Sequence, residues 1–168
     1  MKKAVFSVLV DNTSGVLSRV AGLFSRRGFN IDSLTVSQTE DPAYSRMTIV
    51  STGDNDVLDQ IEKQLRKQVD VKEVKVLSPD NSVTRELILV KVSASPEDRQ
   101  AVIATSDIFR AKIVDVSNDS LTAELTGNQN KIEAFISLLG ADRIIELVRT
   151  GVTGLERGSG SLSDGIED

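Results

Sequence analysis

The stretch Val8–Val20, VLVDNTSGVLSRV, decides how this chain begins to fold. Its apolar start predicts a strand, which we expect to be central because residues 4–10 are apolar on both faces. The polar segment Asp11–Ser14 is typical of turns and of helix N-termini. After Gly15, apolar residues return at helical spacing, at Val16, Leu17, Val20, Leu23 and Phe24. The stretch therefore predicts a strand that turns directly into an amphipathic helix.

The rest of the first half extends this unit to the order β-α-β-β-α-β. The first helix should end at Arg26 and Arg27, just before Gly28. The apolar phase shifts between Ile31 and Leu34, so we expect the second strand to begin irregularly or with a bulge. The predicted strands span residues 4–10, 29–39, 44–52 and 70–77, and a second helix follows Asp54. This order predicts a ferredoxin-like α+β fold, in which an antiparallel sheet carries both helices on one face.

A second β-α-β-β-α-β pattern follows the polar segment Ser78–Ser82. Ser95 as N-cap and Pro96 at the first helical position predict the start of its first helix, which should end near Asp107. The predicted strands span residues 85–93, 111–117, 120–127 and 143–150, and Gly140 closes the last helix. We therefore expect two ferredoxin-like domains in tandem, at residues 1–78 and 85–151, joined by a linker at 79–84.

The chain ends in a Gly/Ser-rich, acidic tail at residues 152–168, with a net charge of −3. Segments of this composition bury little apolar surface, so we expect the end of the tail to be disordered or weakly docked. The glycines of residues 151–160 lack the Gly-x-x-x-x-Gly-Lys-Ser/Thr pattern of a nucleotide loop.

The composition narrows the possible classes of function. The 168 residues include no Cys and no His, which removes disulfides, thiol chemistry and the commonest general base. The net charge of −5 disfavours a nucleic-acid partner, and only Phe6 and Tyr44 are aromatic on the strands that RNA-binding domains of this topology use. No apolar run is long enough to span a membrane, and Met1–Phe6 lacks the features of a signal peptide. We therefore expect a cytoplasmic protein that binds neither membranes nor nucleic acids.

The turn between the first strand and the first helix is the strongest candidate for a binding site. In the simplest interpretation it only starts a helix, because any such turn favours cap residues. However, the first N–H groups of a helix lack internal partners and attract anions such as a ligand carboxylate. Gly15 would let a ligand approach the backbone closely, and Asn12 offers a donor and an acceptor to a zwitterion. A second amide, Asn30, lies in a predicted strand, where Asn is uncommon.

Other polar clusters have simpler structural explanations. The acidic pairs Glu40/Asp41 and Asp54/Asp56 could bind a metal or act in acid–base chemistry, but they lie in turns and at a helix start, where acids are expected. The pair Arg26–Arg27 could bind phosphate, but it also suits the end of a helix. We therefore predict no catalytic residue and no metal site.

At Asn12–Leu17 and Gly28–Ile31, the first half resembles an ACT domain, a β-α-β-β-α-β regulatory module that binds amino acids. Longer segments resemble the small regulatory subunits of acetolactate synthase (acetohydroxyacid synthase). These segments lie in both halves, at Gly22–Val36, Ser45–Ile49, Gln60–Leu65, Val69–Val71, Arg85–Val92, Phe109–Val116 and Arg149–Leu155. The resemblance covers nearly the whole chain except the end of the tail.

The resemblance implies a non-catalytic subunit that activates a large catalytic subunit and confers feedback inhibition by valine, an end product of branched-chain amino-acid biosynthesis. Thiamine diphosphate, Mg²⁺ and FAD are then expected on the catalytic subunit, and no cofactor is expected in this chain. The resemblance also implies a homodimer of ACT domains paired side by side, with a ligand site at the interface. One chain would supply Asn12, Thr13, Ser14, Gly15, Val16 and Leu17, and the other would supply Asn30 and Ile31.

The second half keeps the topology but not the turn. Ser93–Glu97 stands in its place, and Pro96 removes one of the N–H donors that a carboxylate would use. We therefore predict no amino-acid site of this type in the second half. Two alternatives remain open for the whole chain: a free-standing amino-acid sensor that acts on another partner, and a small enzyme on a ferredoxin-like fold. The enzyme is disfavoured because no convincing nucleophile–base pair is present.

Overall fold

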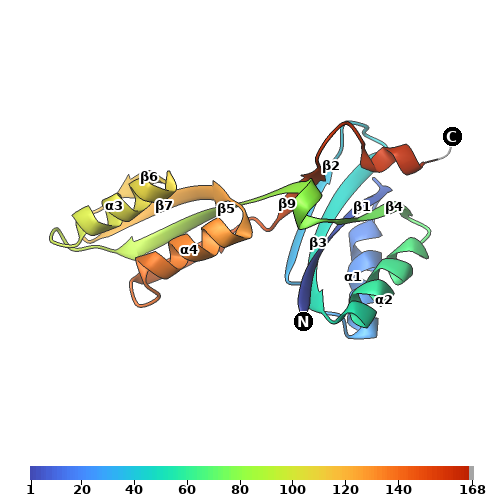
Figure 1. Cartoon of the computed structure of the whole chain (residues 1–168), viewed down its shortest axis with the longest axis horizontal. Helices are drawn as coiled ribbons and strands as arrows, with labels where there is room; N and C mark the ends of the chain where they lie inside the picture. Colours follow the sequence, from blue (N-terminus) through green and yellow to red (C-terminus); the bar gives the residue numbers. More distant parts are fainter. Residues whose placement is uncertain (167–168) are drawn as a thin grey trace. The chain divides into compact units, whose positions relative to one another are not determined.

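The structure is a computed structural model, and it describes residues 1–166. The chain forms two units, of which the first contains residues 1–83 and 152–166 and the second contains residues 84–151. Each unit has the order β-α-β-β-α-β, with a mainly antiparallel sheet and two helices (Figure 1). The prediction of two ferredoxin-like α+β repeats is confirmed. Within residues 1–166, no helix is long and apolar enough to cross a membrane.

The first unit is built around β1 (Lys2–Asp11). The strand order is β2-β3-β1-β4, so β1 is a central strand, as its apolar residues on both faces predict. α1 ends at Gly28, whose φ of 69° is left-handed, and Arg26 and Arg27 occupy its last turn. The remaining elements are α1 (Val16–Arg27), β2 (Ser33–Gln38), β3 (Tyr44–Gly53), α2 (Asn55–Arg66) and β4 (Val71–Leu77).

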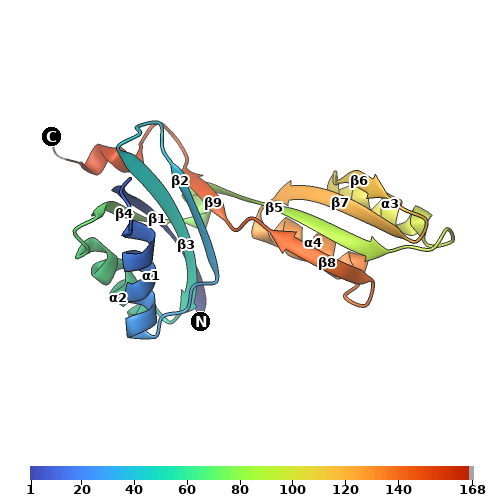
Figure 2. The same ribbon diagram turned by 180° about the vertical axis from the view of Figure 1, so that it is seen from behind.

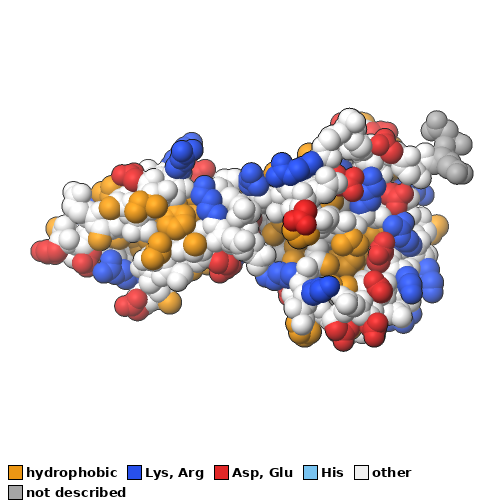
Figure 3. Space-filling view, viewed as in Figure 1, with side chains coloured by type: hydrophobic (Ala, Val, Ile, Leu, Met, Phe, Trp, Pro, Cys, Tyr) orange, Lys and Arg blue, Asp and Glu red, His pale blue; other side chains and the backbone are white. Residues whose placement is uncertain are grey.

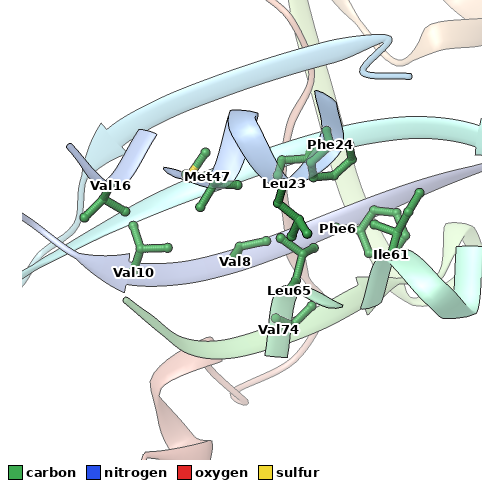
Figure 4. Packing of buried hydrophobic residues seen from close by; sticks show 12 residues of the cluster. Phe6, Val8, Val10, Val16, Leu23, Phe24, Met47, Ile61, Leu65 and Val74 are labelled. Atoms are coloured by element: carbon green, nitrogen blue, oxygen red, sulfur yellow. The ribbon is translucent and has the colours of Figure 1, made fainter. Parts of the chain in front are cut away.

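The core of the first unit lies between its sheet and its two helices (Figure 4). Phe6, Val8 and Val10 alternate along β1 and point to this side of the sheet. α1 and α2 add residues spaced by three or four positions, namely Val16, Val20, Leu23, Phe24, Ile61 and Leu65. The period of two in the strand and of 3.6 in the helices therefore sets which faces meet.

The opposite face of this sheet carries the C-terminal segment, residues 152–166 (Figure 2). The segment contains β9 (Thr153–Glu156), which pairs with β5 (Ser82–Ser93). It also contains a short 3-10 helix, η2 (Leu162–Gly165), which packs against β1 and β4. Leu162 is only 5% exposed. The disordered or weakly docked end was expected for the last part of the tail; as far as residue 166, this apolar side chain and several polar contacts hold the segment on the sheet. Residues 167–168, which were part of that prediction, lie outside the described residues.

The second unit repeats the topology, with the strand order β6-β7-β5-β8. Ile88 and Val90 of the central strand pack with Phe135 and Phe109 of the two helices, whose rings lie 5.3 Å apart. The hairpin turns at Asn118–Asp119, between the strands predicted at residues 111–117 and 120–127. The elements are β5 (Ser82–Ser93), α3 (Arg99–Phe109), β6 (Lys112–Val116), β7 (Ser120–Gly127), α4 (Gln129–Leu139) and β8 (Ile144–Arg149).

Three boundaries differ from those expected. β2 begins at Ser33 rather than at residue 29, because residues 29–32 leave the end of α1 irregularly before pairing begins. α3 begins at Arg99, because Ser95 forms a turn in which its Oγ accepts a hydrogen bond from the Asp98 N–H (3.3 Å). In place of the linker at 79–84, the chain forms the 3-10 turn η1 (Pro79–Asn81) and the first residues of β5.

Candidate functional site

The N-terminus of α1 is not capped by any side chain. The sequence predicts a cap within Asp11–Ser14, but Gly15 is the N-cap residue, with a left-handed φ of 85°. α2 and α4, by contrast, are capped by Asp54 and Asn128, whose side chains accept backbone N–H bonds at 2.9 Å. In α3, the preceding turn takes over this role, since the Arg99 N–H donates to the Ser95 carbonyl. The first turn of α1 can therefore donate to an external carboxylate.

Asn12 shapes the turn before this helix. Its Nδ2 donates to the Pro42 carbonyl (2.9 Å), and its Oδ1 accepts a bond from Ser45 Oγ (3.1 Å). The Asn12 backbone N–H also donates to the Ala43 carbonyl (2.9 Å). The amide thus holds the turn against the β2–β3 hairpin, and only part of its hydrogen-bonding capacity remains for a ligand.

Arg19, which the sequence reasoning missed, lies directly over Gly15. A Cβ placed on Gly15 would lie 2.7 Å from Arg19 Nη1. Arg19 Nε and Nη2 bond the two carboxylate oxygens of Asp70 at 2.6 and 3.2 Å, and this pairing lowers the pKa of Asp70 below its usual value. A basic residue in the first turn of a helix is unfavourable, because it lies at the positive end of the helix dipole. Its presence indicates that a nearby acid or another anion compensates its charge.

The other predicted residues of this turn differ in what they can offer. Thr13 and Ser14 are exposed, and the Ser14 carbonyl accepts a weak bond of 3.5 Å from Arg19. The Val16 side chain is 4% exposed and packs in the core, so only its backbone can face a ligand. Leu17 is 47% exposed and presents an apolar side chain beside the uncapped turn.

Asn30 and Ile31 lie where the chain leaves the other end of α1. Asn30 is exposed, its Nδ2 donates to Asp32 Oδ1 (2.6 Å), and its carbonyl accepts a bond from Ser51 Oγ (2.5 Å). Ile31 is partly buried against the core, as is Phe29, whose ring packs edge-on against Phe24 with centroids 6.0 Å apart. This segment is therefore anchored by its apolar residues and leaves the Asn30 amide at the surface.

The structure does not bring the two groups of predicted residues together within one chain. α1 has 12 residues and separates Gly15 from Gly28. At 1.5 Å per residue, the two ends lie about 18 Å apart, which exceeds the length of an amino-acid ligand. A single chain therefore places the two groups of predicted residues, the predicted half-sites, at opposite ends of one helix.

The clefts of the two units involve other residues. In the first unit, a cleft of about 460 Å³ is lined by residues that include Lys2, Phe6, Leu58 and Leu77. In the second unit, a cleft of about 420 Å³ lies between α3 and α4. Within residues 1–166, no group of three or more acidic side chains is placed to hold a metal ion. Positive and negative side chains are interspersed on the face of each unit seen in Figure 3.

Comparisons with known proteins cover both halves of the chain. A family model described as the AHAS small subunit-like ACT domain matches residues 6–73, and one described as the small subunit of acetolactate synthase matches residues 85–158. The chain is 52% identical over 159 residues to a probable acetolactate synthase small subunit of Methanothermobacter thermautotrophicus, which covers 94% of this chain and 95% of that protein. The chain belongs to the family of acetolactate synthase small subunits.

Other members of the small-subunit family show the same extent of similarity. The small subunit of acetolactate synthase isozyme 3 of Escherichia coli is 50% identical over 157 residues, covering 93% of this chain and 96% of that protein. The crystal structure of the small subunit from Thermotoga maritima superposes with a TM-score of 0.85 and 43% identity, covering 95% of this chain and 99% of that one. The match over residues 6–73 contains both predicted half-sites as well as Arg19 and Asp70, and the second match reaches past β9.

Proposed function

We propose that this small subunit activates the large catalytic subunit of acetolactate synthase and that valine, bound to the ACT domain, reduces that activity. The uncapped N-terminus of α1 at Gly15 carries the proposal of an effector site. Its free N–H groups and partial positive charge suit the carboxylate of an amino acid, and Arg19 adds a guanidinium above them. The half-exposed Leu17 supplies an apolar surface for a branched side chain.

A homodimer would complete each site. In a dimer with two-fold symmetry, every contact occurs twice with the chains exchanged. If the two α1 helices lie antiparallel beside each other, the N-terminus of one faces Asn30 and Ile31 of the other chain. The exposed amide of Asn30 uses one N–H on Asp32 Oδ1 of its own chain, so its second N–H and its Oδ1 remain available to the ligand. The separation of the half-sites within one chain supports this arrangement.

Linkage explains how such a site would control an enzyme. Valine that bridges two chains favours the dimer arrangement in which the half-sites meet. If the catalytic subunit is more active with another arrangement, valine lowers activity, and a coupling on the order of 1–3 kcal/mol suffices. We propose that thiamine diphosphate, Mg²⁺ and FAD are held by the catalytic subunit. A chain without His or Cys suits a regulatory role better than a catalytic one.

Reconstitution tests the function directly. The purified chain is mixed with an acetolactate synthase large subunit, and product formation is measured with and without valine. We expect activity to rise on mixing and to fall when valine is added. Unchanged activity on mixing would favour the free-standing sensor, and turnover by the chain alone would favour an enzyme. Leucine and isoleucine are titrated in parallel, because selectivity among side chains that differ by about one methylene is small.

Complementation tests whether the site is shared between chains. Leu17→Glu places a carboxylate next to the uncapped turn, where it competes with the ligand carboxylate, and Leu17→Gln is its matched neutral control. Asn30→Ala removes the other half-site. Each variant alone should bind valine at least about 10-fold more weakly, since a charge-assisted or buried polar contact is lost.

A mixture of the two variants then gives a distinctive result. After subunit exchange, about half of the dimers are mixed, and each of these holds one site with both halves intact, so about a quarter of the sites regain wild-type affinity. Calorimetric titration counts these sites. If both halves came from one chain, the mixture would regain none.

A further inference from the structure

We infer that hydrogen bonds from β2 to Val152 couple ligand binding at the effector site to the segment in which the chain returns from the second unit to the first. This inference rests on the proposed function, because it requires a ligand at Asn30 and Ile31. It assigns a role in regulation to Ser33 and Thr35, which lie outside the predicted site, and to the C-terminal segment.

Both backbone polar groups of Val152 are bonded by side chains of β2. The Val152 N–H donates to Ser33 Oγ at 2.8 Å, and Thr35 Oγ1 donates to the Val152 carbonyl at 3.1 Å. Ser33 and Thr35 are two residues apart on one strand, so both point to the face opposite the helices. Val152 is the first residue of the first unit after the chain has completed the second unit, which ends at Gly151. The return connection is thus bonded to two residues of one edge strand.

The same strand begins next to the predicted effector half-site. Ser33 directly follows Asn30–Asp32, the segment that leads from α1 into the sheet. Asp32 is tied to that sheet by its backbone N–H, which donates to the Val50 carbonyl at 2.8 Å, and by Thr52 Oγ1, which donates to Asp32 Oδ2 at 2.5 Å. A ligand that bonds the Asn30 amide therefore acts on a short segment, residues 30–33, that is hydrogen-bonded to the sheet and ends at Ser33 Oγ.

The rest of the C-terminal segment is held mainly by contacts that a small movement of β2 can weaken. Arg46 Nη1 donates to the Gly154 carbonyl at 3.4 Å, and Lys75 Nζ bonds Glu156 Oε2 and the Ser161 carbonyl at 3.2 Å each. These contacts are long or partly exposed, and Leu162 is the main apolar anchor. Segments with few buried apolar contacts open more readily than core strands. A change at Ser33 can therefore change how firmly residues 152–156 are held.

The mechanism is a coupling between two places on the first unit. Valine orders residues 29–32, the ordered start of β2 strengthens the two bonds to Val152, and the return connection becomes less mobile. By linkage, firm docking of this connection strengthens valine binding in turn. The catalytic subunit would sense the change through the second unit, which is joined covalently to the first only through β5 and this connection.

Hydrogen exchange on the isolated chain tests the first step. Adding valine to the wild-type chain should slow exchange of the backbone N–H groups of Val152–Glu156 by about 5-fold or more. The double variant Ser33→Ala/Thr35→Val should show no such slowing and, by the same linkage, should bind valine several-fold more weakly than the wild type. Ser37→Ala is the matched control, because Ser37 is an exposed residue on the same face of β2, and it should respond as the wild type does.

Inhibition of the reconstituted enzyme tests the second step. With Ser33→Ala/Thr35→Val, the inhibition at saturating valine should fall by about half or more, while activation without valine stays at the wild-type level. Thr35→Ser keeps the hydroxyl, so its inhibition by valine should match that of the wild type, whereas inhibition of Thr35→Val should be reduced.

The outcomes separate this inference from the proposed function. If wild-type chain does not bind valine in calorimetry, the proposed effector is wrong. If valine binds and inhibits, but exchange of residues 152–156 stays constant and the double variant is inhibited like the wild type, the coupling through Ser33 and Thr35 is overturned. Loss of folding by the double variant, seen as a lowered unfolding midpoint, is checked with Ser33→Ala and Thr35→Val separately. The inference requires each single variant to lose part of the inhibition at valine concentrations that saturate its site.

Discussion

Arg19 and Asp70 form a two-point ion pair that joins the first turn of α1 to the start of β4, with Nε 2.6 Å from Oδ2 and Nη2 3.2 Å from Oδ1. The pair compensates a basic residue at the positive end of a helix dipole. It also holds a guanidinium over the Gly15 backbone, at the place where a ligand carboxylate would bind. In the proposed site, structural support and ligand recognition would therefore depend on the same side chain.

The ion pair predicts a specific dependence of stability on pH. The hydrogen bond from Arg19 lowers the pKa of Asp70 below 3.8, so its contribution to stability is fully present above 3.8 and is lost as the pH falls through the lower folded-state pKa. The difference in unfolding free energy between wild type and Asp70→Asn should thus be largest near neutral pH and should shrink below 3.8. Urea titrations at a series of pH values measure it. Arg19→Gln should show the same trend, whereas a pH-independent difference would contradict the assignment.

Two glycines with left-handed φ provide a matched pair of alanine substitutions. Gly28→Ala meets no atom within 4 Å, so it should cost only the backbone strain of about 1–2 kcal/mol. Gly15→Ala carries the same strain and also overlaps Arg19 Nη1, so it should cost more and disturb the bond to Asp70. Thermal or urea unfolding compares the two. Equal costs would mean that Arg19 moves away without penalty.

The Arg149–Glu86 pair predicts a large effect in the second unit. Arg149 Nε bonds Glu86 Oε1 at 2.8 Å, and the Glu86 side chain is only 7% exposed. Arg149→Met leaves this carboxylate buried without its partner and should cost roughly 2–4 kcal/mol. Glu133 bonds the same guanidinium at 2.8 Å but is 53% exposed, so Glu133→Gln should cost less than about 1 kcal/mol. Urea unfolding of both variants checks the order, and similar values would contradict it.

The docking of the C-terminal segment can be tested with two leucines. Leu162 is buried and Leu155 is 59% exposed. Leu162→Ala should weaken docking and speed tryptic cleavage after the exposed Arg157 by about 10-fold, because cleavage follows the open population. Leu155→Ala should change the rate by less than about 2-fold. Equally fast cleavage of wild type and Leu162→Ala would show that Leu162 does not anchor the segment.

Much of the fold could be predicted because its signals are local. The alternation of Phe6, Val8 and Val10 and the helical spacing after Gly15 depend on residues within a few positions of each other. The N-cap of α1 was predicted less well, because Asp11–Ser14 contains several suitable residues and only the turn geometry selects Gly15. The start of α3 was misplaced for a similar reason, since Ser95 can cap a helix or close a turn.

The candidate site was predicted only in part. The residue types at Asn12, Gly15 and Asn30 pointed to a ligand, but the sequence did not reveal that Asn12 is bonded to the neighbouring hairpin. Arg19 was missed because its partner Asp70 is 51 positions away. Such pairs depend on how strands are ordered in the sheet, and periodicity within one segment carries no information about that order.

The sequence by itself determined the order of the strands and helices, the apolar faces that form both cores, and the absence of thiol and imidazole chemistry. Tertiary structure decided which distant residues meet. It separated Gly15 from Asn30 by the length of α1, and it placed Val152 on Ser33, 119 positions earlier in the chain. The physical reason is that local periodicity sets the conformation of a segment, whereas the packing of segments against one another sets its partners.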